Sequence, residues 1–271
     1  MEKTLTLPDT IIRYEFDGQG PPLLMVHGVS ADRTSLSPLR PFLEDHFTVY
    51  AMDRRGRNKS IDQGDYAVHK EFDDIASLVD AIYQDSGNQP VNLMGHSFGG
   101  FCCLEAILLT PHIKSLILYE PAAPGIKDNP PQEVVDHLQK LLDAGKPEEV
   151  LTLLLKNIAG MTDDEIAALR EGPGWDSRVA AAHTISREGN GLRNFPRFDP
   201  ERFRHVDLPV LLVLGDESPS EEKAYLDQLH KALKNSSLVT LPNQAHLATR
   251  RAPDLLAREM VTFIEGIEVK D

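Results

Sequence analysis

The pentapeptide Gly95-His96-Ser97-Phe98-Gly99 constrains this chain most, because it separates two apolar runs of different character. Residues 90–94 predict a short buried strand, and residues 98–109 predict a buried helix. So tight a reversal from strand to helix requires small residues, which the glycines in and just after the pentapeptide provide. A serine at the apex stands strained and exposed above the sheet, beside a helix N-terminus that favours developing negative charge. The pattern therefore predicts that Ser97 is a nucleophile.

Strand-like and helix-like segments alternate along most of the chain. Runs that are apolar throughout, which are typical of parallel strands covered on both faces, occupy residues 23–26, 47–52, 91–94, 115–119, 210–214 and 237–241. Apolar stripes at helical spacing lie between them. This alternation predicts an α/β fold with a doubly wound, mostly parallel sheet. Ligands of such sheets bind beyond the carboxyl ends of the strands. The polar residues expected there are His27, Asp53, Ser97, Glu120, Asp216 and His246.

Residues 124–204 interrupt the alternation, since they hold helix-like segments at 131–142, 148–158, 163–169 and 176–186 and no convincing strand. We expect an all-helical lid over the serine, inserted after the strand that ends near Glu120. Residues 1–123 and 205–271 would then form the core. The aromatic residues of this segment are expected either to line a pocket or to fill the lid's own small core, and they are Trp175, Phe195 and Phe198.

The charge balance limits the class of partner. The formal net charge is −14, which disfavours binding of nucleic acid or anionic membranes through a broad basic surface, so a small-molecule substrate is expected. No run approaches the roughly 20 apolar residues of a membrane span. The N-terminus lacks the apolar region of a signal peptide, so we expect a cytoplasmic protein.

Metal and cofactor motifs are not apparent in the sequence. The histidines and cysteines lack metal-ligand spacing, and no phosphate-binding loop motif occurs, so neither a metal nor a cofactor is expected. The two cysteines, Cys102 and Cys103, are adjacent on the apolar helix after Ser97 and are expected to be buried thiols.

A serine hydroxyl is a poor nucleophile at neutral pH and needs a base within hydrogen-bond reach. His246 lies in the loop between the last predicted strand and the final helix, at the same edge of the sheet as Ser97. We predict that His246 is this general base. His96 is next to the nucleophile in sequence, but its side chain must point away from Ser97, which favours a packing role.

The chain resembles the α/β-hydrolase superfamily over essentially its whole length. The motifs that carry the resemblance are His27-Gly28, Asp53-Arg54-Arg55-Gly56, Gly95-His96-Ser97-Phe98-Gly99-Gly100 and Gln244-Ala245-His246. The resemblance implies that Ser97 attacks a carbonyl while His246 takes and returns the proton. It also implies an oxyanion hole from the backbone N–H groups of Val29 and Phe98.

The sequence identifies the acid of the triad less directly than the serine and the histidine. The family commonly places it three residues after the glycine that is Gly215 here, but that position is Ser218, which predicts a helix N-cap with Pro219 and Glu221 behind it. Some family members take the acid from the strand after the nucleophile helix. That residue is Glu120, and a carboxylate there would need a partner such as protonated His246. We predict Glu120, with Asp216 or Glu217 as the alternative.

Three other motif residues are expected to be structural. Asp53 and Arg55 are expected to organise the loop 53–60, in which Asn58 replaces a glycine that is usual in the family. Asparagine tolerates the left-handed conformation better than most residues, so this turn can form. His27 is expected to shape the oxyanion loop.

The resemblance implies a serine hydrolase that acts on a carboxylic ester, a lactone or a related small acyl group through an acyl-enzyme. The apical serine argues against dehalogenases and epoxide hydrolases of the superfamily, which use aspartate there. The same triad also serves lyases, perhydrolases and cofactor-free oxygenases, and a hydrolase-like small-molecule receptor is the alternative outside enzymes. The sequence leaves the physiological substrate and the oligomeric state open.

Overall fold

A computed structural model describes residues 1–126, 130–157, 160–172 and 174–268. Within them a nine-stranded sheet has the order β1-β2-β4-β3-β6-β7-β8-β9, with β5 paired to β2. Its strands are β1 (Glu2–Leu7), β2 (Thr10–Gly18), β3 (Pro22–Val26), β4 (Thr48–Asp53), β5 (Ile61–Asp62), β6 (Val91–His96), β7 (Ile113–Tyr119), β8 (Val210–Gly215) and β9 (Ser236–Leu241). Neighbours from β4 to β9 are parallel, whereas β1, β2 and β5 pair antiparallel. The predicted α/β fold with a mostly parallel sheet is confirmed.

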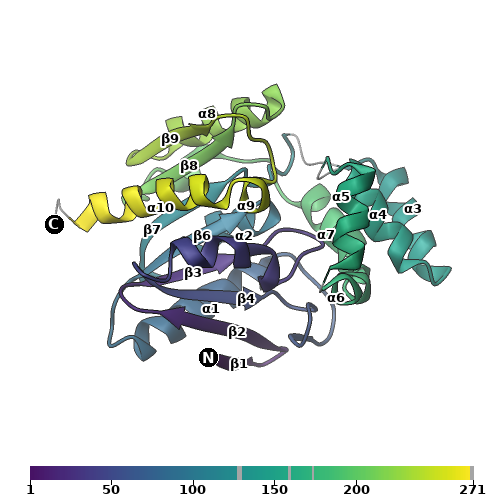
Figure 1. Cartoon of the computed structure of the whole chain (residues 1–271), viewed down its shortest axis with the longest axis horizontal. Helices are drawn as coiled ribbons and strands as arrows, with labels where there is room; N and C mark the ends of the chain where they lie inside the picture. Colours follow the sequence, from purple (N-terminus) through teal and green to yellow (C-terminus); the bar gives the residue numbers. More distant parts are fainter. Residues whose placement is uncertain (127–129, 158–159, 173, 269–271) are drawn as a thin grey trace.

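Helices cover both faces of the sheet (Figure 1). Helices α1 (His69–Asp85), α2 (Phe98–Ala106) and α8 (Ser220–Ala232) pack on one face. The 3-10 helix η1 (Arg33–Phe42), α9 (Ala248–Arg251) and α10 (Pro253–Glu268) pack on the other. Because both faces are covered, the side chains of β3, β6, β7 and β8 are buried almost throughout. Cys102 and Cys103 are buried free thiols on α2, as predicted.

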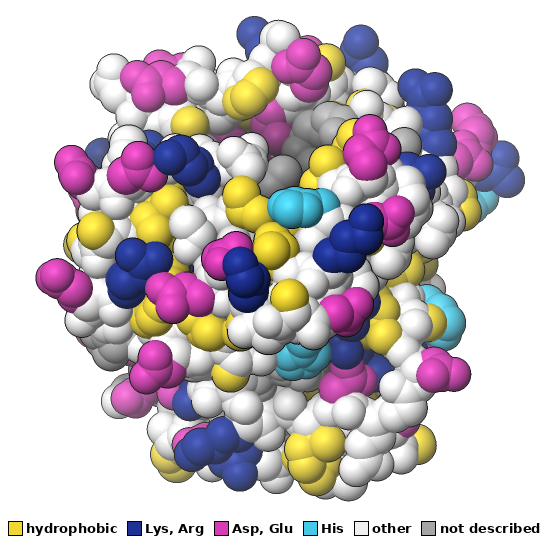
Figure 2. Space-filling model, turned by 90° about the vertical axis from the view of Figure 1, so that its right-hand side faces the viewer, with side chains coloured by type: hydrophobic (Ala, Val, Ile, Leu, Met, Phe, Trp, Pro, Cys, Tyr) yellow, Lys and Arg dark blue, Asp and Glu magenta, His cyan; other side chains and the backbone are white. Residues whose placement is uncertain are grey.

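Further helices lie between β7 and β8. They are α3 (Gln132–Asp143), α4 (Pro147–Asn157), α5 (Asp163–Glu171), α6 (Trp175–Ala180), α7 (His183–Asn194) and the 3-10 helix η2 (Pro200–Phe203). Helices α3 to α7 gather beside one end of the sheet (Figure 1), and α4 to α7 share an apolar core of their own. Figure 2 looks onto this side and shows acidic and basic side chains interspersed with apolar ones.

Two expectations for this segment need correction. The predicted helix 176–186 is two helices, because α6 ends at Ala180 and α7 begins at His183. Ile158, the predicted end of an earlier helix, lies outside the described residues. Of the three aromatic residues, only Trp175 packs in the helices' own core. Phe195 and Phe198 pack against the main core, Phe195 on Phe72 and Phe101 and Phe198 on Phe203 and Tyr225. Phe195 also lines a pocket, which is separate from the one that contains Ser97.

Candidate active site

The turn that carries Ser97 is strained. Ser97 stands between β6 and α2 with φ 55° and ψ −125°, and positive φ is uncommon for residues other than glycine. Small neighbours are required here. A Cβ atom on Gly99 would lie 2.4 Å from the carbonyl oxygen of His27, and one on Gly95 would lie 2.6 Å from the Cα of Gly100. The turn presents Ser97 to a pocket at the carboxyl edge of the sheet.

The loop that carries His246 is anchored to the strands beneath it. The hydroxyl of Tyr119 donates a hydrogen bond to the carbonyl of Ala245 and accepts one from the N–H of Ala248 at 2.9 Å. Nε2 of His96 donates to the carbonyl oxygen of His246 at 2.9 Å. Burial, together with the charge of His246, lowers the pKa of His96 to about 3, so His96 is neutral and packs beneath the loop.

Glu120 follows β7 directly and is only 1% exposed. Its Oε2 accepts a hydrogen bond from Nδ1 of His246 at 2.9 Å, and its Oε1 accepts from the backbone N–H of Gly215 at 2.9 Å. The Ser218 hydroxyl also donates to Oε1. Burial acts to raise the pKa of Glu120, but the hydrogen bonds and the charge of His246 outweigh it and hold this pKa below its ordinary value. An ionised Glu120 thus orients the His246 ring with its proton on Nδ1, which leaves Nε2 as the basic nitrogen.

The alternative acids lie elsewhere. Asp216 and Glu217 are exposed, and Asp216 accepts a hydrogen bond from the backbone N–H of Gln244 at 3.3 Å, so it braces the turn. The predicted cap at Ser218 is wrong. Helix α8 begins at Ser220 without a side-chain cap, because the Ser218 hydroxyl donates instead to the buried Glu120 carboxylate, and such charge-assisted bonds are the stronger ones.

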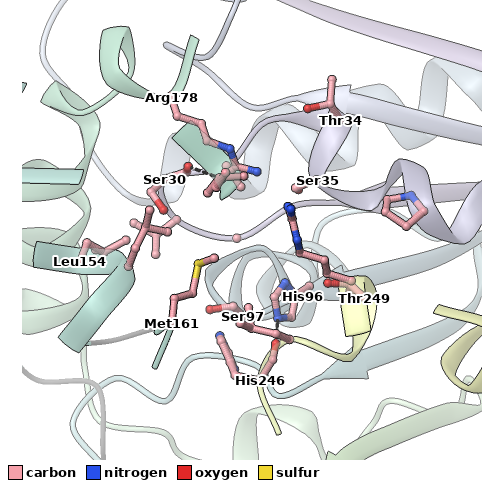
Figure 3. Close-up of a pocket in the computed structure, with 18 residues that line it drawn as sticks. Ser30, Thr34, Ser35, His96, Ser97, Leu154, Met161, Arg178, His246 and Thr249 are labelled. Atoms are coloured by element: carbon pink, nitrogen blue, oxygen red, sulfur yellow. Dashed lines mark hydrogen bonds between the residues drawn. The ribbon is translucent and has the colours of Figure 1, made fainter. Parts of the chain in front are cut away.

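Ser97 and His246 line the same pocket, and Figure 3 shows their side chains next to each other. Among the described residues no hydrogen bond joins the Ser97 hydroxyl to the His246 ring. Such bonds are often long in ligand-free active sites and tighten when substrate binds. The fold therefore brings Ser97, His246 and Glu120 together in the order that nucleophile, base and orienting acid require.

The peptide between Gly28 and Val29 is clamped through its carbonyl. The Gly28 oxygen accepts hydrogen bonds from His27 Nδ1 at 2.9 Å and from Arg54 Nη2 at 3.1 Å. His27 Nε2 accepts from the backbone N–H of Arg54 at 3.2 Å, which places the imidazole proton on Nδ1. Burial and nearby arginines keep the pKa of His27 well below its ordinary value, so the ring is neutral. A trans peptide points its N–H away from its C=O, so this clamp directs the Val29 N–H away from Arg54.

The second candidate oxyanion donor is the Phe98 N–H, in the first turn of α2, where N–H groups lack intrahelical partners. Across the described part of the chain, neither this N–H nor that of Val29 is bonded to a protein acceptor. The loop and Ser97 are in contact, since a Cβ on Gly28 would lie 3.0 Å from the Ser97 Cβ. The Arg54 guanidinium lies 4.7 Å from the centroid of the Phe98 ring, so one arginine braces both donor segments.

Sequence reasoning did not identify the partners of Arg54. Arg54, Arg57, Glu71 and Glu188 are at most 1% exposed. Glu188, on α7, accepts hydrogen bonds from Arg54 at 3.1 Å and from Arg57. Burial acts to raise the pKa of Glu188, but the two arginines outweigh it and hold the pKa below its ordinary value. This cluster ties α7 to the loop behind Gly28. No local pattern marks it, because Glu188 comes from a distant helix.

The motif residues Asp53 and Arg55 hold their loop in place. Asp53 accepts a hydrogen bond from the backbone N–H of Arg33 at 3.0 Å, and Arg55 donates two bonds of 2.8 Å to Asp74. Asn58 has φ 49°, the left-handed conformation that its position requires.

The pocket has a volume of about 160 Å³, close to the roughly 150 Å³ cavity that admits benzene. Its apolar wall comes from the helices between β7 and β8, through Leu154, Leu155, Met161 and Leu169. Its other lining side chains are mostly polar and come from the loop after Gly28, from η1, from the Ser97 turn, from α6 and from the segment around His246. A small substrate therefore fits beside Ser97.

In the described part of the chain, no three His, Cys, Asp or Glu side chains are grouped as metal ligands, and no helix is both long and apolar enough to span a bilayer.

Comparison with known proteins decides the family. A model of the alpha/beta hydrolase fold matches residues 21–249, which is most of the 271-residue chain. The chain belongs to the alpha/beta hydrolase family. The motif resemblance in the sequence is thereby confirmed.

Several known proteins are similar to this alpha/beta hydrolase over most of their length. It is 24% identical over 262 residues to 2-(acetamidomethylene)succinate hydrolase of Mesorhizobium japonicum, with 92% of this chain and 90% of the relative covered. It is 26% identical over 251 residues to the pimeloyl-[acyl-carrier protein] methyl ester esterase of Neisseria meningitidis, with 90% and 93% covered. An alpha/beta hydrolase structure from Sphaerobacter thermophilus matches with a TM-score of 0.80 at 30% identity, covering 97% of this chain and 100% of that one. The protein is accordingly a hydrolase.

Proposed function

We propose that this hydrolase cleaves carboxylic esters, lactones or related small acyl substrates through an acyl-enzyme on Ser97. The observation that carries the proposal is the 2.9 Å hydrogen bond from His246 to the buried Glu120, beside a pocket that holds both His246 and Ser97. This arrangement gives a serine hydroxyl the neighbouring base that it needs and gives the base a carboxylate that fixes its tautomer. The methyl ester esterase among the relatives supports an ester substrate.

The reaction follows from these roles. Nε2 of His246 takes the proton of the Ser97 hydroxyl as its oxygen bonds to the substrate carbonyl carbon. The N–H groups of Val29 and Phe98 stabilise the resulting oxyanion. The tetrahedral species then breaks its bond to the alcohol oxygen, which receives the proton from His246. Water, deprotonated by His246, attacks the carbonyl carbon of the acyl-enzyme. The bond to the Ser97 oxygen then breaks, His246 returns the proton to that oxygen, and the acid leaves. Glu120 stays ionised throughout and stabilises the imidazolium.

We also propose that residues 124–204 form a lid that selects the substrate. Helices α4 and α5 contribute apolar side chains to the pocket and α6 contributes Arg178, so the segment encloses the space in which the acyl group would lie. Hydrolase relatives favour hydrolysis over the non-hydrolytic reactions that the same triad supports.

A fluorophosphonate probe tests the nucleophile. We expect the wild-type protein to be labelled on the peptide that contains Ser97, and to release nitrophenol from 4-nitrophenyl acetate. The variant Ser97→Ala should lose both properties, whereas Ser220→Ala, an exposed serine at the start of α8, should keep both. Wild-type protein that is folded but neither labelled at Ser97 nor active on the ester would refute the proposal.

A further inference from the structure

The pocket beside Ser97 is cationic. Among the described residues, its lining includes Arg178, from α6, and Arg250, from α9, and no acidic side chain. The chain as a whole carries a formal net charge of −14, so the charge of this pocket is opposite in sign to that of the protein. Hydroxyl side chains line the same pocket and come from Ser30, Thr34, Ser35 and Thr249.

Arg178 is held by a backbone carbonyl. Its Nη1 donates one hydrogen bond, of 2.8 Å, to the carbonyl oxygen of Ser30 (Figure 3). In the described part of the chain, neither Arg178 nor Arg250 forms an ion pair. By contrast, Arg54, Arg55 and Arg57, which are buried, are each paired with a carboxylate. A guanidinium offers five N–H donors, so most of those on Arg178 are not used by the carbonyl of Ser30.

Burial disfavours the charged form of Arg178. It lowers the pKa of Arg178, the charge of Asp32 opposes this effect, and the charge of Arg250 lowers the pKa further. The Asp32 carboxylate is also engaged by other donors, since Oδ1 accepts from the backbone N–H of Thr34 at 2.9 Å and Oδ2 accepts from the Ser177 hydroxyl at 3.1 Å. An anion in the pocket would add to the stabilisation that Asp32 gives this cation.

We propose that the substrate carries a carboxylate group that Arg178 binds, with Arg250 and the hydroxyls of Ser30 and Thr249 completing its coordination, since the hydroxyls of Thr34 and Ser35 already donate to Asp32. The proposal rests on the serine hydrolase function above, because the carboxylate and the scissile acyl group belong to one molecule. A planar carboxylate matches the fork of a guanidinium. The apolar side chains of Leu154 and Met161 leave room for a short hydrocarbon linker, and the volume of about 160 Å³ limits its length. The substrate class is therefore a small ester or lactone with a free carboxylate.

Two 4-nitrophenyl esters of glutaric acid test the proposal. One has a free carboxylate at the far end, and in the other this carboxylate is a methyl ester. After subtraction of spontaneous hydrolysis, we expect kcat/KM of the wild-type enzyme to be about 10- to 100-fold higher for the charged ester, the range for a hydrogen bond to a charged group. The variant Arg178→Gln should bring the ratio of the two kcat/KM values close to 1, and Arg178→Lys should keep part of the preference for the charged ester. Arg258→Gln removes one positive charge from the exposed side of α10 and should leave the ratio unchanged.

A binding measurement separates this proposal from the function on which it rests. Titration calorimetry of glutarate into Ser97→Ala protein should show binding that is lost when Arg178→Gln is added. If neither ester is cleaved, the hydrolase proposal fails, and the titration still decides the carboxylate site. Equal kcat/KM for the two esters in wild type, together with no glutarate binding, would overturn the proposal. Binding of inorganic phosphate as tight as that of glutarate would also overturn the assignment to a carboxylate.

Discussion

Glu120 and His246 stand 126 positions apart in the chain and are joined by a 2.9 Å hydrogen bond between Oε2 and Nδ1. The carboxylate comes from the end of β7, whereas the position after β8 at which the family usually carries its acid holds Ser218. Because β7 and β8 are parallel neighbours, their carboxyl ends reach the same histidine. The Ser218 hydroxyl donates a hydrogen bond to Glu120, the carboxylate that replaces an acid at position 218.

Replacing Glu120 tests its role in orienting His246. We expect Glu120→Gln to lower kcat for 4-nitrophenyl acetate by about 10²–10⁴-fold, as loss of the orienting carboxylate does in other triads. Asp216→Asn removes the same charge from an exposed turn and should leave kcat nearly unchanged. A larger loss in Asp216→Asn than in Glu120→Gln would transfer the role to Asp216.

The pH dependence of stability should report the ionised state of Glu120. The pKa of Glu120 in the folded protein lies below its ordinary value of 4.5. The stabilisation from its ionised form is therefore complete above about pH 4.5 and is lost as the pH falls through the lowered folded value. The difference in unfolding free energy between wild type and Glu120→Gln, measured by urea titration, should shrink as the pH is lowered from about 6 to about 3. A difference that grows over this interval would contradict the lowered pKa.

The close approach behind the nucleophile should make Gly99 intolerant of a side chain. A Cβ on Gly99 would lie 2.4 Å from the backbone oxygen of His27, so Gly99→Ala must displace the strand end that leads to the oxyanion loop. We expect a loss of about 1–3 kcal/mol or more, seen as a lower Tm, together with reduced activity. Gly266→Ala, in α10, meets no atom within 4 Å and should keep or raise the Tm. Equal Tm values for the two variants would show that the turn can relax.

The buried charge cluster should be sensitive to loss of its acid. Glu188→Gln leaves Arg54 and Arg57 without their shared carboxylate, and breaking a buried pair costs about 3–5 kcal/mol of unfolding free energy. Glu165→Gln breaks an exposed pair with Arg251 but keeps a good residue in the capping box of α5, so it should cost less than about 1 kcal/mol. Urea unfolding of both variants gives the comparison. Similar small losses would mean that water or neighbouring groups compensate the arginines.

Short-range patterns predicted much of the fold. The parallel strands were predicted because a buried run of a few apolar residues is a local signal. The Ser97 turn was predicted because its glycines are also a local signal. The strands β1 and β5 were not predicted. Strand β1 is largely exposed and mixes charged with apolar residues, and β5 has only two residues. The predicted helix at 176–186 was wrong, because the break between Ala180 and His183 carries no glycine or proline to mark it.

Local patterns were enough to predict that a serine stands on a strand-to-helix turn and that a histidine and a glutamate follow strands of the same sheet. Parallel strands bring their carboxyl ends to one edge, so this part of the site follows from local patterns and topology. Three other features depend on how distant segments pack. They are the acid that contacts His246, the contact of Arg54 with the Gly28 carbonyl, and the presence of Arg178, and of none of Trp175, Phe195 and Phe198, in the lining of the pocket beside Ser97. These contacts join segments far apart in the chain. The packing of the inserted helices against the sheet sets them, and no short-range period in the sequence encodes that packing.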